Sequence, residues 1–229
     1  MTTSGVYTFD PELAAIAEEA FERCGIDPAT ITARHAKSAR RSMDYLFSGW
    51  ANRGPHLWAI DQQTIAAPTL VAGTATYNCP AGTVAVLEMV VRRSGVDTPI
   101  SPMARDEYLA IPDKTTQGLP NRFYFDRSRT TPTLTFWNVP ENATDQIIYY
   151  RMRQLQDSGG AALTADIPFR WQEALAAGLA AKLAEKYAPE REQSLVSKAE
   201  RAYALAYQED RERTPTTTRV KYSTNIRRR

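Results

Sequence analysis

The sequence has few of the residues that most often carry out catalysis or bind metals. It holds 2 histidines and 2 cysteines among 229 residues. His35 falls on an apolar helical stripe and His56 in a Gly-Pro-His turn, and neither belongs to a histidine pair or an HExxH motif. Cys24 and Cys79 have no metal-ligand spacing and no disulfide pattern. We therefore expect structural histidines, buried thiols in a reducing compartment, and neither a metal nor a cofactor.

Signatures of the common enzyme classes are also missing. No GxSxG, GxxxxGK or GxGxxG motif occurs, and the Ser158-Gly159-Gly160 break is followed by no phosphate-binding lysine. Neighbouring acids such as Glu18 and Glu19 would point about 100° apart on a helix, which is a poor arrangement for two cooperating carboxylates. The sequence therefore predicts a protein that is not an enzyme, although it leaves open a glycosidase whose carboxylates come from distant segments.

Long apolar runs are absent as well. No stretch approaches the roughly 18 uninterrupted apolar residues of a membrane span. The N-terminus, MTTSGVYTFDPEL, lacks the basic region followed by an apolar run that marks a signal peptide. We expect a cytosolic product without a membrane partner.

What the chain does contain is typical of a soluble globular protein. Hydrophobic residues make up 43% and charged residues 24% of the chain, whose length suits one generous domain or two small ones. The net charge is only +2, but the first helical segment is acidic and the C-terminus is basic. Ends of opposite sign suit head-to-tail contact between unlike surfaces, and two solvated helix faces are the simpler alternative. The acids of the first segment are Asp10, Glu12, Glu18, Glu19, Glu22 and Asp27.

The most unusual stretch is the last one. From Arg211 it reads RERTPTTTRVKYSTNIRRR, in which Glu212 is the one acid among many cations. Such a segment cannot bury enough apolar surface to fold by itself, so we predict an extended arm over residues 213–229 that a partner orders. The predicted partner-binding residues are Arg219, Val220, Lys221, Tyr222, Ile226, Arg227, Arg228 and Arg229.

Two helices are expected near the N-terminus. The Asp-Pro pairs at residues 10–11 and 27–28 predict their starts, because aspartate caps free N–H groups and proline fits the first helical turn. Gly25 predicts the end of the first helix, and residues 52–55 the end of the second. The loop between them is very short, which favours an antiparallel pair.

The middle of the chain has a different character. Residues 57–155 are rich in Val, Thr, Ile and Tyr, with frequent proline and glycine. The turn spacing predicts an antiparallel meander with a sheet core of aromatic residues, and a short helix at 105–110. The predicted strands are residues 69–77, 84–93, 121–125, 133–137 and 146–154.

Two more helices are predicted after residue 158, at about 166–187 and 190–211. The first has an i, i+4 ladder of large apolar residues and small residues at 176–181 that allow close approach of another helix. Because neither helix pair buries its apolar stripe alone, we expect helices from both chain ends to pack together. The ladder residues are Trp171, Leu175, Leu179, Leu183 and Tyr187.

The predicted fold is therefore α+β. It combines an antiparallel helical bundle, built from N- and C-terminal helices, with an inserted antiparallel β-meander and an extended C-terminal arm. The predicted parts are N-terminal helices over 1–55, the β domain over 56–157, C-terminal helices over 158–212, and the arm over 213–229.

Several short phrases occur along the chain in a fixed order. They read WANRGPHLW at 50–58, GTATYNCP at 73–80, YLAIPDK at 108–114, FYFDR at 123–127, LTFWNVP at 134–140 and YYRMR at 149–153. Together they resemble the head-to-tail adaptor proteins of tailed phages, also called tail accessory or head-completion proteins, most closely those of short-tailed phages. The resemblance covers about residues 10–212, with one departure at Asn138, where relatives carry a proline before a second proline.

The resemblance implies a virion structural protein at the head–tail junction, present in the host cytoplasm during assembly. It implies a homo-oligomeric ring of about twelve copies beneath the portal protein. The helical part would form the ring, the β part would face a tail tube or nozzle protein, and the arm would lie along portal subunits. The ring would also help to retain packaged DNA and contact it non-specifically.

Two functions of other classes stay open. One is a cell-wall hydrolase acting during entry, for which the sequence nominates no carboxylate. The other is a DNA-binding accessory factor, in which the arm with Tyr222 contacts phosphates. Fewer than about ten cations without a base-reading motif would give only salt-sensitive, sequence-blind binding.

Overall fold

A computed structural model describes residues 9–54 and 56–210, and this part of the chain is a mixed α+β protein, as predicted. No helix within these residues is both long and apolar enough to cross a membrane. The α-helices are α1 (Leu13–Arg23), α2 (Ala33–Ala51), α3 (Arg105–Ala110), α4 (Gln172–Tyr187) and α5 (Glu192–Glu209). The 3-10 turns are η1 (Pro28–Thr30), η2 (Leu57–Ala59), η3 (Phe169–Trp171) and η4 (Pro189–Arg191). The strands are β1 (Ile60–Ile65), β2 (Thr76–Asn78), β3 (Thr83–Arg93), β4 (Val96–Pro99), β5 (Ser101–Pro102), β6 (Gln117–Gly118), β7 (Arg122–Asp126), β8 (Thr133–Trp137), β9 (Val139–Pro140) and β10 (Gln146–Arg153).

Helix α1 ends as predicted but begins differently. Its N-cap is Glu12, which makes no capping hydrogen bond through its side chain. Asp10, the predicted cap, instead lies 3.4 Å from Gln172 Nε2, from which it accepts a hydrogen bond. Gly25 has a φ of +81° and lets the Ile26 N–H reach back into the last turn of the helix. A glycine in this conformation closes the helix without strain.

The predicted second helix is divided into two pieces. Asp27 caps only η1, where its carboxylate accepts the Ala29 N–H at 2.9 Å. Helix α2 then starts behind Thr32, whose hydroxyl accepts the His35 N–H at 3.4 Å while His35 Nδ1 accepts the Thr32 N–H at 3.2 Å. This reciprocal capping box satisfies two free N–H groups, so the helix begins there and not at the Asp-Pro pair.

Helix α4 lies at the centre of the helical part. Leu175, Leu179 and Leu183 have no exposed surface, which confirms the predicted ladder. The helix contacts α1, α2 and α5, and buried residues of all four helices form one core cluster. A Cβ atom on Gly178 would lie 2.9 Å from Leu46 Cδ2, so the glycine allows α2 to pack closely against α4. Helices from the two ends of the chain thus share one core.

The larger sheet has the strand order β1-β10-β3-β4, and each of its pairs is antiparallel. The late strand β10 lies between β1 and β3, so the prediction of a meander is wrong in its strand order, although antiparallel pairing is confirmed. Strand β1 has no counterpart among the predicted strands, because its sequence, IDQQTI, is mostly polar. Ile147 faces Ile65 on one side and Val91 on the other, which gives the sheet a buried apolar face.

The smaller sheet has the order β2-β8-β7-β5, and β6 pairs with β9 separately. The short pairs β5–β7 and β6–β9 are parallel. Of the predicted strand at 69–77 only β2 forms, because the Gly73 turn interrupts it. Phe123, Phe136 and Tyr149 are buried in a core that both sheets share, as the sequence predicts for its aromatic residues. The peptide bond before Asn138 is cis.

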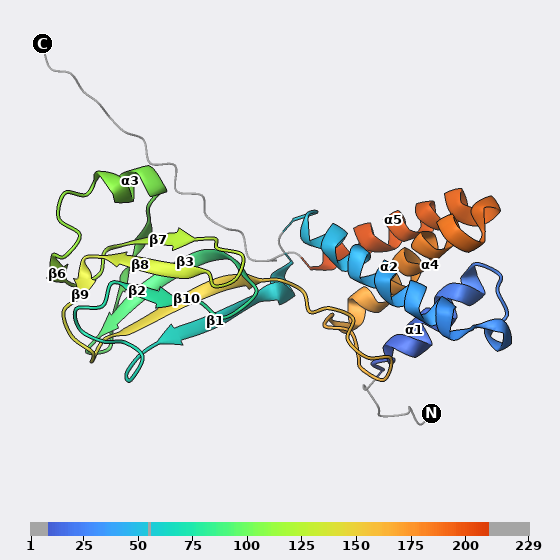
Figure 1. Ribbon diagram of the computed structural model, residues 1–229, viewed down its shortest axis with the longest axis horizontal. Helices are drawn as coiled ribbons and strands as arrows, with labels where there is room; N and C mark the ends of the chain where they lie inside the picture. The colour runs from blue at the N-terminus through green and yellow to red at the C-terminus, as the bar shows by residue number, and fades with distance from the viewer. Residues whose placement is uncertain (1–8, 55, 211–229) are drawn as a thin grey trace, which may run out of the picture.

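The helical part and the β part lie end to end (Figure 1). Each has its own cluster of buried apolar residues. Between residues 9 and 210 the chain passes between the two parts after α2 and again between β10 and η3.

Candidate assembly site: the aromatic junction and the helical surface

The segment that joins α2 to β1 packs its rings against the C-terminal helices. The Trp50 ring centroid lies 5.3 Å from that of Trp171 and 5.8 Å from that of Tyr203. His56 meets Trp171 edge to face at 4.8 Å. We call this group the aromatic junction, and it consists of Trp50, His56, Trp58, Trp171, Tyr203 and Tyr207. It explains structurally why tryptophans begin and end the phrase WANRGPHLW.

Arg53 ties the end of α2 to α5. Its guanidinium donates two hydrogen bonds to the Glu200 carboxylate, at 2.7 and 2.8 Å. It also lies over the Tyr203 ring, 4.7 Å from the centroid. The hydrogen bonds with Glu200 raise the pKa of Arg53, so the guanidinium keeps its charge. The arginine of the Asn-Arg-Gly phrase therefore connects two helices.

Gly54 follows with a backbone conformation that other residues rarely adopt. Its φ is +137°, and a Cβ atom there would lie 3.3 Å from the Tyr207 hydroxyl. The glycine thus turns the chain away from α2 while the aromatic junction closes over it.

Asp210, the last residue that the structure describes, is buried beside the aromatic junction. It is 6% exposed, and its Oδ2 accepts the Leu57 N–H at 3.1 Å. Arg170 Nη2 lies 3.6 Å from Oδ1. These contacts hold the end of α5 against the segment that follows α2.

The histidines and cysteines have structural roles. His56 is 2% exposed, with Nε2 at 3.2 Å from the Trp50 carbonyl oxygen, and His35 caps α2 and packs on Tyr187. Both thiols are free and buried, and burial raises the pKa of Cys24 and of Cys79. These observations confirm the predicted structural histidines and buried thiols.

Two members of adjacent acid pairs, Glu19 beside Glu18 and Glu107 beside Asp106, make structural contacts. Glu19 pairs with Arg23 at 2.7 Å, and Glu107 accepts the Ala104 N–H at 3.1 Å. Across residues 9–54 and 56–210, no group of three or more His, Cys, Asp or Glu residues is placed to hold a metal ion.

Arg151 and Arg153, from the phrase YYRMR, stabilise the end of the β part nearest the helices. Arg151 bonds both Asp61 oxygens, at 2.7 and 3.0 Å, and Thr83 Oγ1 at 2.8 Å. Burial alone would raise the pKa of the Asp61 carboxyl, but its bonds with Arg151 outweigh burial and the pKa is lowered. Arg153 donates to both carboxylate oxygens of Asp166, which lies on the segment returning to α4.

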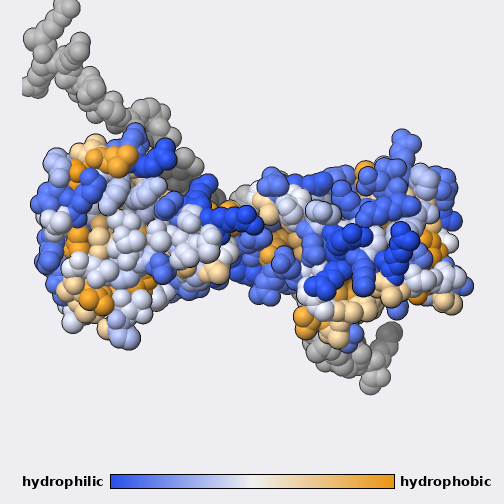
Figure 2. Space-filling model, viewed as in Figure 1, coloured by the Kyte–Doolittle hydropathy of each residue, from blue (hydrophilic) through white to orange (hydrophobic). Residues whose placement is uncertain are grey.

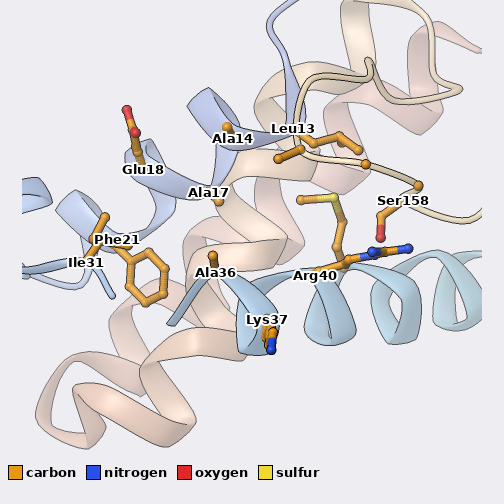
Figure 3. Close-up of a pocket in the computed structure, with 14 residues that line it drawn as sticks. Leu13, Ala14, Ala17, Glu18, Phe21, Ile31, Ala36, Lys37, Arg40 and Ser158 are labelled. Atoms are coloured by element: carbon orange, nitrogen blue, oxygen red, sulfur yellow. The ribbon is translucent and has the colours of Figure 1, made fainter. Parts of the chain in front are cut away.

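Two grooves flank α1 on the helical part. The first, of about 240 Å³, runs between α1, α2 and residues 158–161, with an apolar floor that includes Leu13 and Phe21 (Figure 3). Glu18 lies on the α1 side of this groove, and Lys37 and Arg40 lie on the α2 side. The second groove, of about 550 Å³, lies between α1 and the start of α4.

The second groove contains two exposed phenylalanines. Phe9 is 66% and Phe169 is 71% exposed, and their rings meet edge to face at 6.2 Å. Neither residue is part of the predicted site. A proline lies within two residues of each, in Phe-Asp-Pro and Pro-Phe-Arg, and indicates a nearby helix start but not the exposure of the phenylalanines.

The predicted partner-binding residues, Arg219 to Arg229, lie outside the described residues. Sequence reasoning missed three features that the structure reveals. These are the Arg53–Glu200 pair, the buried Asp210 and the basic outer face of α2. Only the last could have been recognised from spacing, since Arg34, Lys37 and Arg41 recur at three and four residues.

Comparison with known protein families gives one match. A family described as SU10 adaptor protein matches residues 50–229, which is most of the chain. A comparison with curated proteins found no match. The matched region begins at Trp50 and contains the aromatic junction, the β part, α4, α5 and the C-terminal segment. The chain therefore belongs to the SU10 adaptor protein family, and it is, as the sequence predicts, a head-to-tail adaptor of tailed phages and a structural component of the virion.

Proposed function

We propose that this chain is the subunit of a ring of about twelve copies that binds beneath the portal protein and connects it to a tail tube or nozzle protein. The observation that carries the proposal is the attachment of the C-terminal segment. Asp210 is buried against Leu57 beside the aromatic junction, within the region that matches the adaptor family. A segment that starts from a rigid point can reach a defined surface on a partner.

The two parts of the molecule have different roles in this assembly. The helices within residues 1–55 and 158–212 form the ring, and the inserted β part over 56–157 faces the tail. The separate core clusters support this division, because each part has its own buried core. The grooves beside α1 support a role for the helical part in contacts between copies or with the portal.

The arm over residues 213–229 binds along portal subunits. Its cations meet acidic groups, and Val220, Tyr222 and Ile226 fill apolar sites, with Arg219, Lys221 and Arg227–Arg229 around them. Ordering the arm costs about 1–2 kcal/mol for each residue fixed, so one arm binds weakly. A ring binds through all its arms at once, and this avidity makes attachment long-lived.

A closed ring at the head–tail junction also helps to retain packaged DNA. Retention follows from lasting attachment, because a ring that leaves the portal would leave the exit open. The virion role thus depends on the arm as well as on the folded body.

Removal of the arm tests the proposal. A chain that ends at Arg213 keeps all described residues and should fold, yet it should not remain on the portal. The intact chain, the truncated chain and a full-length Arg127→Gln/Arg129→Gln control are each sedimented with portal rings at about 150 mM salt. Arg127 and Arg129 are exposed residues of the β part, so the control removes cations without touching the arm. Equal recovery of the truncated and intact chains would overturn the role of the arm.

A further inference from the structure

The outer face of α2 carries an unusual concentration of positive charge. Its cations are all exposed, and none has an ion pair within residues 9–54 and 56–210. Figure 2 shows strongly hydrophilic atoms over the helical part, where α2 runs in Figure 1. The residues are Arg34, Lys37, Arg40 and Arg41.

Helix α2 itself supplies no ion-pair partner for these cations. Its one acid, Asp44, accepts the Ser158 N–H at 2.9 Å. On the inner flank of the helix, α4 adds a further cation: Lys186 donates to Ser42 Oγ at 2.6 Å and to Ser38 Oγ at 3.4 Å. No carboxylate of the described chain pairs with Lys186. Elsewhere in the helical part, Arg23, for example, bonds the Glu173 carboxylate with two nitrogens.

A candidate anion-binding site lies next to this face. Lys37 and Arg40 line the groove beside α1 together with the loop formed by Ser158, Gly159 and Gly160. Ser158 is 3% exposed, and its Oγ has no hydrogen-bond partner in the described structure. In Figure 3 the Arg40 guanidinium and the Ser158 hydroxyl extend toward the same end of the groove. A buried hydroxyl without a partner, beside a guanidinium, suits a phosphate oxygen.

We propose that this face of α2, together with the candidate anion-binding site at Ser158, binds the phosphate backbone of double-stranded DNA without reading its bases. From Arg34 to Arg41 the helix rises about 10 Å, which spans about three phosphates of one strand. The large ring at the end of this face, Tyr45, is 72% exposed, and no cluster of apolar anchors separates the cations. The apolar floor of the adjoining groove, which includes Leu13 and Phe21, is buried and comes from α1. A protein partner would call for such anchors, whereas phosphates need only cations and donors. The use of this site in the virion rests on the proposed function, but its binding is a property of the single chain.

The test is binding of the full-length chain to a fluorescent mixed-sequence duplex, measured by anisotropy between 50 and 200 mM NaCl. The triple variant Arg34→Gln/Lys37→Gln/Arg41→Gln should reduce the slope of log K against log salt by about 2.7, which is about 0.9 for each lost phosphate contact. A matched variant, Arg127→Gln/Lys198→Gln/Arg201→Gln, removes three exposed cations from other surfaces and should leave the slope unchanged. Ser158→Ala should weaken binding about 2- to 10-fold at fixed salt.

The outcomes separate this inference from its alternatives. A third variant, Arg227→Gln/Arg228→Gln/Arg229→Gln, reports on the arm. If it alone reduces the slope, the DNA contact belongs to the arm and the inference is wrong. If the α2 variant binds DNA normally but fails to join portal rings, the face meets an acidic protein surface, which also overturns it. A chain that binds DNA through α2 but does not join the portal would contradict the proposed function alone. Circular dichroism of each variant checks that the fold is intact.

Discussion

Strand β3 of the β part and the outer face of α2 in the helical part differ in how their cations are paired. On β3 two neighbouring arginines are bonded to carboxylates of the β part: Arg92 to Asp97, and Arg93 to both Glu141 and Asp145. In the helical part, α2 presents cations that have no ion pair in the described chain. Charge that is satisfied internally holds a fold together, whereas unpaired charge is available to partners.

Both parts expose apolar residues, and in the helical part Phe9 and Phe169 are 66% and 71% exposed. The β part leaves Val84, Leu87 and Tyr150 about two-fifths exposed on the larger sheet, with values of 41%, 43% and 43%. We expect the exposed apolar residues of the larger sheet to meet an apolar protein surface, and the unpaired cations of α2 to meet a charged partner. Tests of the comparison begin with the junction that joins the two parts.

The largest expected effect is at the aromatic junction. Trp171 has no exposed surface and contacts Trp50, His56 and Tyr203, so Trp171→Ala should cost about 3–5 kcal/mol of unfolding free energy. Urea unfolding followed by near-UV circular dichroism measures this loss. Tyr150→Ala on the exposed sheet face is the control and should cost less than about 1 kcal/mol. Equal losses in the two variants would contradict a central role for the junction.

Backbone conformation at the end of α2 gives the next effect. Gly54→Ala places a side chain at a φ of +137° and should destabilise the protein by about 1–3 kcal/mol. Gly49→Ala, on the same helix, meets nothing within 4 Å of its new Cβ and should stabilise it by about 0.5–1 kcal/mol. Thermal unfolding of both variants measures the two signs. A Gly54→Ala variant as stable as the natural chain would show that the turn does not need glycine at this position.

The Arg53–Glu200 pair should contribute less. Both side chains are about half exposed, at 42% and 56%, so solvent screens their attraction. A double-mutant cycle with Arg53→Gln and Glu200→Gln should give a coupling of about 0.5–1 kcal/mol, because the pair is bidentate. No coupling would mean that Arg53 acts only by packing on Tyr203.

Acid should weaken the contact between α1 and α4 slightly. Hydrogen bonds from Arg23 lower the pKa of Glu173, so the pair contributes stability above the unfolded-state pKa, about 4.3, and loses it as pH falls through the folded value. Glu173→Gln should therefore lower the melting temperature at pH 7 more than at pH 3. An equal loss of melting temperature at pH 7 and at pH 3 would show that the Arg23–Glu173 pair does not contribute to the loss of stability in acid.

Regular apolar periods made much of the fold predictable. The α4 ladder and strands β3, β7, β8 and β10 appear close to their expected positions, because their large apolar residues also form the cores. Strand β1 did not follow from the sequence, since Asp61, Gln62 and Gln63 are held in the sheet by their β10 neighbours and not by an apolar pattern. Likewise, no local signal places β10 between β1 and β3, because that order depends on contacts between distant segments.

The sequence was enough to predict an assembly protein, but not the contacts that form the candidate site. The phrase WANRGPHLW and the family resemblance indicate an assembly protein. They do not indicate that Arg53 bonds Glu200 or that Asp210 is buried beside η2, since these contacts join residues about 150 positions apart. The predicted arm residues remain a proposal, because they lie outside the described part of the chain.

The most direct test of the account is the mass of the complex between this chain and portal rings from the same genome, measured by light scattering. The account predicts a gain of about one ring of subunits per portal, about twelve copies. No gain in mass, with the chain remaining a free monomer, would contradict it.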